Sequence, residues 1–255
     1  MERARELYIE ACESLSEGDH DRAIELLLEA RSLNKSVAEI PRMLGRAYGD
    51  AGRSDEAIKW MDEALEMKPE DPDILCDRGV LEMRTEGGWA RAVNYFDRSL
   101  AAGQDGGTVW SNKATCLAYM EKHAEAVECY SKALEYEDDD PAIWFNKGLS
   151  LSVLAGGGVE VDGGNEIVSI HMSIKAPDSE KTEEALEAYL KVIDLDPTDV
   201  EARVNAGISL AWLDRLEEAA AFFRRALDID EANEQAQRWL DLLEKGPGDT
   251  QSRGR

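Results

Sequence analysis

The sequence predicts an all-α protein in which about six pairs of short helices stack into a solenoid and a further helix covers one end. Three observations predict this fold. An alanine-centred motif recurs along the chain, a second small residue precedes each copy by one helix, and the apolar positions follow helical spacing. No single helix pair can bury its apolar face alone, so neighbouring pairs must stack.

The alanine-centred motif sets the period of the chain. Its copies are separated by 34, 35, 34, 59 and 34 residues, so the long interval is one period with an insertion of 25 residues. The anchoring residues are Ala23, Ala57, Ala92, Ala126, Ala185 and Ala219, and the small residues one helix earlier are Ala11, Gly45, Gly79, Ala114, Gly148 and Gly207. A large residue shares the face of each alanine four positions later: Leu27, Met61, Phe96, Tyr130, Tyr189 and Phe223.

The phased pattern resembles that of the tetratricopeptide repeat (TPR) family. Trp110 and Trp144 occupy the tryptophan position of that family, which Pro41 and Arg203 occupy in the second and sixth repeats. The second repeat, with Leu44-Gly45, Tyr48, Ala57, Ala64 and Pro69, is the best match. The resemblance implies a right-handed α-α superhelix over residues 4–245, with repeats at about 4–37, 38–71, 72–106, 107–140, 141–199 and 200–233.

Two segments depart from the repeats near the C-terminal end. Residues 233–245 predict an amphipathic helix, with Ala236, Trp239, Leu240 and Leu243 on its apolar face, that caps the last repeat. Residues 246–255 predict a disordered tail. Within the fifth repeat, residues 156–180 predict a β-hairpin, because Val159 and Val161 alternate with a polar residue, Asp-Gly-Gly-Asn supplies a turn, and an alternating run follows. Four apolar residues of that run share one face and are candidate contact residues: Val168, Ile170, Met172 and Ile174.

Composition excludes several classes of function. The chain has 54 acidic and 29 basic residues, a net charge of −25, whereas nucleic acids and anionic membranes require a basic surface. No stretch approaches the roughly 18 uninterrupted apolar residues of a membrane helix. The N-terminus lacks the pattern of a signal peptide, so we expect a cytoplasmic protein with reduced cysteines. The acidity suits a high-salt cytoplasm and an ordinary one equally.

No group of residues predicts catalysis, and we expect no cofactor or metal site. The glycine clusters lack the Gly-Lys-Ser/Thr ending of a phosphate loop, and no metalloprotease, hydrolase or calcium-loop motif occurs. His20 and His123 each precede an anchoring alanine by three residues, so we interpret them as residues that pack in turns.

In the TPR family the first helix of each repeat lines a concave groove, and matching positions give candidate peptide contacts. Arg42 and Arg46 lie one turn apart and either receive a carboxylate of a ligand or pair with Glu39, Asp50 and Asp73. The apolar end either docks a partner or is covered by the hairpin or cap helix. The candidates are Tyr8, Arg42, Arg46 and Arg84, with Cys12, Asp50 and Cys76 beside them, then Ser111, Thr115 and Tyr119, then Phe145, Leu149, Val153, Val204, Ile208 and Trp212.

The sequence therefore predicts a protein–protein interaction scaffold that binds a peptide or partner segment in its groove without catalysis. The alternative is a regulatory or assembly subunit of an enzyme complex that uses the hairpin for docking or self-association. The second strand of the hairpin is longer than its local partner, so it must find another surface, on its own groove or on a second chain. Neither the partner nor the oligomeric state follows from the residues.

Overall fold

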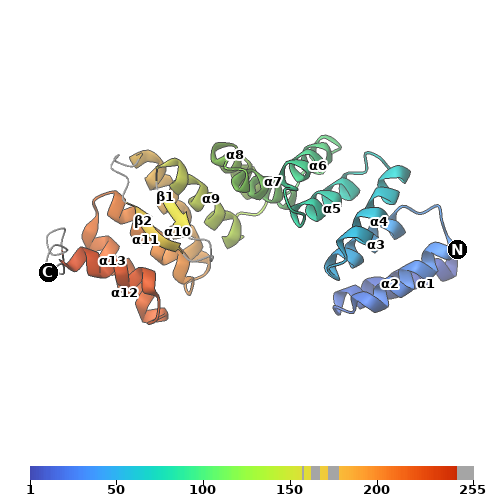
Figure 1. The fold of residues 1–255 in the computed structure, drawn as a ribbon, viewed down its shortest axis with the longest axis horizontal. Helices are drawn as coiled ribbons and strands as arrows, with labels where there is room; N and C mark the ends of the chain where they lie inside the picture. Colours follow the sequence, from blue (N-terminus) through green and yellow to red (C-terminus); the bar gives the residue numbers. More distant parts are fainter. Residues whose placement is uncertain (157, 162–166, 172–177, 246–255) are drawn as a thin grey trace. The chain divides into compact units, whose positions relative to one another are not determined.

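The computed structural model describes residues 1–156, 158–161, 167–171 and 178–245. Thirteen helices occur in these residues, which confirms the predicted number (Figure 1). They form two compact units, residues 1–120 and 121–255, called here the N-terminal and C-terminal units. The N-terminal unit consists of α1 (Glu2–Ser16), α2 (His20–Leu33), α3 (Glu39–Asp50), α4 (Ser54–Met67), α5 (Pro72–Met83), α6 (Trp89–Ala101) and α7 (Gly107–Tyr119).

The C-terminal unit also consists of helices that pack in succession, and it additionally contains two short strands. Successive helices pack against each other in both units, and α13 packs against α12 and α11. Ala236, Trp239 and Leu240 of α13 are buried, which confirms its predicted apolar face. The elements are α8 (His123–Leu134), α9 (Pro141–Leu154), β1 (Gly158–Val161), β2 (Ile167–His171), α10 (Ser179–Leu195), α11 (Val200–Trp212), α12 (Leu216–Ile229) and α13 (Glu234–Lys245).

Aspartates begin several of the helices. The carboxylate of Asp71 accepts a hydrogen bond from the backbone N–H of Ile74, and Asp140 and Asp199 do the same for α9 and α11. An aspartate at this position satisfies a backbone donor that the helix leaves without an acceptor and interacts favourably with the positive end of the helix dipole. Part of the acidity of the chain therefore defines where its helices start.

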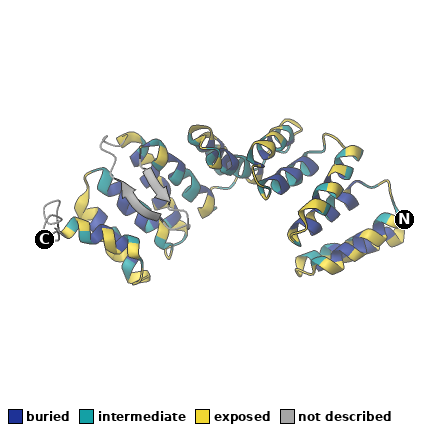
Figure 2. Ribbon diagram, viewed as in Figure 1, coloured by how far each residue is buried: buried dark blue, intermediate teal, exposed yellow. Residues whose placement is uncertain are grey.

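The predicted alanines and large residues form the core between the helices. All six anchoring alanines are fully buried, and the large residues that follow them are at most 1% exposed. A Cβ atom added to Gly79 would lie 2.7 Å from Phe96 Cε1, and one added to Gly207 would lie 2.7 Å from Phe223 Cε1. Glycine is thus required where an aromatic ring of the second helix rests on the backbone of the first. Figure 2 shows the buried residues on the helix faces that meet within each unit.

The turn between the two helices of each repeat also follows the period. Among the described residues of these six connections, one in each has a positive φ angle, and four of the six are glycines: Gly18, Gly52, Gly87 and Gly156. Glu121 and Asp214 take the other two places, with φ of 60° and 61°. Residues with a Cβ atom adopt this conformation at an energetic cost, so these two turns are less favourable locally than the glycine turns.

The insertion in the fifth repeat leaves and rejoins the helices at one place. The backbone N–H of Asp178 donates to the carbonyl oxygen of Ala155 at 2.9 Å, so the two ends of the insertion are joined beside the end of α9. In the structure β1 pairs antiparallel with β2, from Gly158 opposite His171 to Val161 opposite Ile167. The expected continuation of the second strand through Ile174, and the predicted tail 246–255, lie outside the described residues.

Candidate functional site

The predicted groove residues occupy three positions on each first helix. Relative to the small packing residue they lie three residues before it, one after it and five after it, which places them one turn apart on the helix surface. Around Gly45 these are Arg42, Arg46 and Asp50, and around Gly207 they are Val204, Ile208 and Trp212. These three rows, here called the groove rows, have different surroundings in the two units.

Arg42 is held by carboxylates of the next first helix. Its Nε donates to Asp77 Oδ2 at 2.6 Å, and its Nη1 donates to Asp73 Oδ2 at 3.1 Å. Burial raises the pKa of Asp77, and the hydrogen bond and charge of Arg42 only partly oppose that effect. Arg42 therefore forms ion pairs within the groove. One partner, Asp73, was expected from the sequence, and the other, Asp77, was not.

Arg46 differs from Arg42 although it lies one turn away on α3. It is exposed and forms no ion pair with a residue that the structure describes. The other expected carboxylates are engaged elsewhere, since Glu39 pairs with Lys68 at 2.7 Å and Asp50 pairs with Arg84 at 3.2 Å. Arg46 is thus the groove-row arginine whose guanidinium is available to a ligand.

The Cys76 thiol and the Tyr8 hydroxyl beside these arginines are both difficult to deprotonate. Burial raises the pKa of Cys76 to about 11, the charge of Asp77 adds to the rise, and Arg42 and Arg46 oppose it. Burial also raises the pKa of Tyr8, and the neighbouring Cys12 adds to this rise. Both groups stay protonated at neutral pH, so they offer hydrogen-bond donors and no nucleophile.

The remaining groove-row residues of the N-terminal unit form contacts within the unit. Arg84 donates from Nη1 to the carbonyl oxygen of Gly49 at 2.8 Å, in addition to its ion pair. The hydroxyls of Ser111 and Thr115 donate to carbonyl oxygens one turn earlier on α7. Tyr119 stacks on Trp89, a contact that the sequence did not predict because its two residues are 30 positions apart.

The groove rows of the C-terminal unit are apolar and mostly withdrawn from solvent. Val204 and Ile208 are 1% and 5% exposed, so they cannot line an open groove as the sequence predicted. Phe145 meets Tyr189 edge-on, with ring centroids 5.8 Å apart. Phe145, Leu149 and Trp212 are half-buried against the same core as Val204 and Ile208, whereas Val153 is exposed.

Of the four insertion residues proposed for contacts, Val168 and Ile170 lie on β2, and Ile170 stands opposite Val159. Met172 and Ile174 lie outside the described residues. The structure therefore describes the pairing of β1 with β2 but not the predicted continuation of the second strand through Ile174. Contact of the insertion with another surface stays a proposal.

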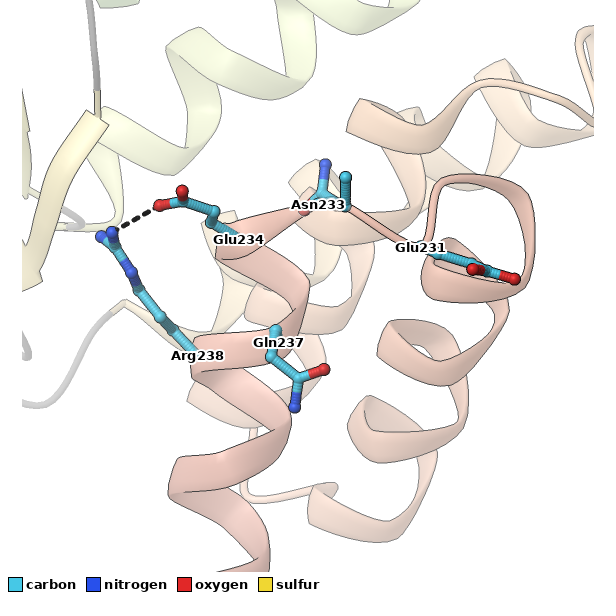
Figure 3. Close-up of a pocket in the computed structure, with 6 residues that line it drawn as sticks. Glu231, Asn233, Glu234, Gln237 and Arg238 are labelled. Atoms are coloured by element: carbon cyan, nitrogen blue, oxygen red, sulfur yellow. Dashed lines mark hydrogen bonds and ion pairs between the residues drawn. The ribbon is translucent and has the colours of Figure 1, made fainter.

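A small depression of about 320 Å³ lies where α12 leads into α13, away from the groove rows (Figure 3). Asn233 accepts a hydrogen bond from the backbone N–H of Ala236 and so begins α13. Arg238 and Glu234 form an ion pair of 2.7 Å at its rim. These polar groups satisfy one another, so the depression has the features of a helix junction and none of a binding site.

The described residues hold no group of three or more side chains placed to bind a metal ion. Over the same part of the chain, no helix has the length and apolar composition needed to cross a membrane. His20 and His123 begin α2 and α8 at equivalent positions, and the Nδ1 atom of each is buried. This placement agrees with packing in the turns.

Comparison with known proteins places the repeats in a family. Sequence models of the tetratricopeptide repeat match residues 14–75, 108–140 and 178–234, which together form more than half of the chain. BBSome complex member BBS4 of Bos taurus is 25% identical over 135 residues, which are 53% of this chain and 26% of that protein. The peroxisomal targeting signal receptor of Candida albicans is 28% identical over 109 residues, 43% of this chain and 14% of that receptor. The chain thus aligns with about a quarter or less of each relative.

Solved structures with low sequence identity share the fold. YrrB, described as a TPR protein with an unusual peptide-binding site, has a TM-score of 0.68 and 20% identity, over 85% of this chain and 98% of that one. PilW, described as a widely conserved type IV pilus biogenesis factor, has a TM-score of 0.71 and 15% identity, over 93% of this chain and 98% of that one. At these identities the likeness concerns the fold alone.

Proposed function

Because this chain belongs to the tetratricopeptide repeat family, we propose that it is an interaction scaffold that binds a peptide segment of another protein and performs no catalysis itself. One observation carries the proposal. The small packing residues of the first helices are buried, whereas Arg46 and Tyr119, groove-row residues of the same helices in the N-terminal unit, are exposed. The description of YrrB as a peptide-binding protein of this fold supports the same function.

The ligand of the N-terminal unit would carry an acidic group. Arg46 offers a guanidinium without an ion pair among the described residues, and a guanidinium binds a carboxylate through two parallel hydrogen bonds. Arg42, held by Asp73 and Asp77, would shape the groove and orient its neighbours without contacting the ligand. Of the two candidate arginines, Arg46 alone is therefore proposed to bind the acidic group of the ligand.

An array of immobilised peptides that vary in charge and apolar content tests this function with the full chain. We expect a subset containing Asp or Glu to bind, with affinity falling as salt rises because exposed charge contacts are screened. Arg46→Glu should abolish that binding. Arg225→Glu, which makes the same change at an exposed arginine on α12, a second helix, is the matched control. Absence of any bound peptide would refute the scaffold proposal, and equal binding by Arg46→Glu would refute the anchor.

A second candidate function is favoured by the way the insertion is attached. Its ends are joined by the Asp178–Ala155 hydrogen bond, so it is added to the fifth repeat without interrupting the packing of α9 on α10. Such an appendage suits an assembly or regulatory subunit that docks through strand edges. Removing residues 157–177 should leave the helical spectrum intact. Loss of dimer mass or of a captured enzyme complex would support assembly, and loss of thermal stability at constant monomer mass would support packing on its own groove.

Residence in the cytoplasm also stays a proposal. The support for it is a set of four free cysteines, two of them buried. Cell fractionation with an antibody to the chain would test this placement directly.

A further inference from the structure

Trp89 and Tyr119 form a stacked aromatic pair on the N-terminal unit. Trp89 begins α6 and Tyr119 ends α7, and their ring centroids lie 4.5 Å apart with planes 5° from parallel. Tyr119 nevertheless remains 66% exposed. Because Trp89 covers one face of the tyrosine ring, the exposed surface is its opposite face and its edge.

The stack gives the exposed ring a fixed orientation. A lone surface tyrosine must lose side-chain freedom when a ligand settles on it, whereas a ring already packed against a neighbour loses less. Tyr119 also occupies the third groove row, five residues after Ala114, on the same helix surface as Thr115. A segment that follows the groove rows of the N-terminal unit would therefore meet this ring.

The aromatic face and the acidity of the chain favour a cation as the occupant. The face of an aromatic ring carries negative electrostatic potential, and the chain has a net charge of −25. Glu86, in the loop that leads into α6 and three residues before Trp89, is exposed and has no ion pair with a described residue. Glu82, the carboxylate that precedes Glu86 in the sequence, is already paired with Arg91.

We propose that the Trp89–Tyr119 stack, together with Glu86 of the loop that leads into α6, is a docking platform for an arginine side chain of the partner segment. Arginine fits better than lysine because its planar guanidinium can lie flat on a ring while its N–H groups reach a carboxylate. The inference rests on the proposed scaffold function and specifies its ligand. The bound segment carries an acidic group for Arg46 and an arginine for Tyr119.

Titration of the full chain with N-acetyl-arginine amide tests the platform without a known partner. The readout is the NMR signal of the Trp89 indole N–H, assigned with Trp89→Phe. We expect a saturating shift, with binding at least about threefold tighter than that of N-acetyl-citrulline amide, which has the same shape and no charge. Tyr119→Phe should keep the binding because it keeps the ring, Tyr119→Leu should weaken it about threefold, and Glu86→Gln should weaken it about twofold.

Equal binding of the arginine and citrulline amides to the unmodified chain would overturn the proposal, and this comparison requires no variant to fold. Full binding by a Tyr119→Leu chain with an unchanged helical spectrum would also overturn it. A shift with N-acetyl-proline amide and none with the arginine amide would assign the ring to an apolar occupant instead. A peptide array without any bound peptide refutes the scaffold, whereas a failed arginine titration beside a successful array refutes the platform alone.

Discussion

The two units place their ion pairs at different depths. In the N-terminal unit the side chains of Arg78 and Glu82 are 8% and 4% exposed, and Arg91 adds a second contact to Glu82 at 2.7 Å. In the C-terminal unit, five described pairs are at least 44% exposed at both partners: Lys122–Glu125, Lys132–Glu135, Arg215–Glu218, Arg224–Glu244 and Arg238–Glu234. One repeat frame thus accommodates buried charge in one unit and surface charge in the other.

The interior of the C-terminal unit has aromatic contacts, whereas the interior of the N-terminal unit holds a buried ion pair. Phe223 stacks on Trp239 with ring centroids 5.9 Å apart, and Phe145 meets Tyr189. Apolar contacts tolerate small changes, whereas a buried charge that loses its partner is strongly destabilising. We therefore expect the stability of the N-terminal unit, more than that of the C-terminal unit, to depend on single charged side chains.

The largest expected effect tests that dependence. Glu82→Ala leaves Arg78 buried with only Asp62, at 3.1 Å, as a carboxylate partner, and should lower the free energy of unfolding by about 3 kcal/mol. Glu218→Ala removes an exposed pair in the C-terminal unit and should cost less than about 1 kcal/mol. Urea denaturation followed by circular dichroism measures both, and equal costs would show that depth does not distinguish the pairs.

The same residue should make the N-terminal unit sensitive to acid. Burial alone would raise the pKa of Glu82, but Arg91 and Arg78 outweigh it and the pKa lies below its ordinary value of 4.5. A carboxyl whose folded pKa is lowered stabilises the fold above its unfolded pKa, and this stability is lost as pH falls through the folded pKa. Stability should therefore decline below about pH 4.5, and Glu82→Gln should flatten that decline at low and high salt alike.

The glycine contacts should behave alike in both units, which sharpens the contrast with the ion pairs. Gly79→Ala and Gly207→Ala each force a methyl group against a buried phenylalanine ring and should cost about 1–2 kcal/mol, after the helix propensity gained by alanine. Gly45→Ala meets the terminal methyl of Met61 at 2.8 Å, which can move, and the carbonyl oxygen of Ala57 at 3.2 Å, so its cost should be smaller than that of the other two. Thermal unfolding of the three variants would contradict this packing role if Gly45→Ala were the most damaging.

A smaller effect separates two tryptophans at the same repeat position. Trp144 in the C-terminal unit donates from Nε1 to the carbonyl oxygen of Asp138 at 2.8 Å, whereas Nε1 of Trp110 in the N-terminal unit is buried and has no acceptor among the residues that the structure describes. Trp144→Phe should therefore cost about 1 kcal/mol more than Trp110→Phe, because only the first loses a hydrogen bond. Chemical denaturation of both variants measures the difference, and a reversed order would refute this reading of the bond.

The smallest effect concerns the turns with positive φ angles. Asp214→Gly relieves a residue with a Cβ atom at φ of 61° and should stabilise the C-terminal unit by about 0.5 kcal/mol. Gly52→Ala, at φ of 74° in the N-terminal unit, should destabilise by a similar or larger amount. A melting temperature lowered by Asp214→Gly would indicate that its side chain contributes more than the turn geometry costs.

The repeat position of Arg203 shows how far a family pattern can change without loss of structure. Arg203 stands where Trp144 stands in the preceding repeat, and its guanidinium donates to the carbonyl oxygen of Pro197, six residues earlier, as the indole of Trp144 does to Asp138. The sequence identified the departure, but the hydrogen bond that replaces the indole was visible only in the structure. Two unlike side chains thus donate to backbone carbonyl oxygens at equivalent positions of two repeats.

The positions at which the helices pack closely could be predicted from the sequence alone. Phased alanines and glycines mark where helices approach closely, because a helix face has a period of 3.6 residues and tolerates only small side chains at a close contact. Tertiary structure alone decided which groove-row residues are available to a ligand. Arg42 meets Asp73 and Asp77, 31 and 35 residues away, and Tyr119 meets Trp89. Such contacts depend on how neighbouring repeats are placed in space, which spacing along the chain does not record. Arg42 is therefore engaged, whereas Arg46, one helical turn away, has no ion pair within the described part of the chain.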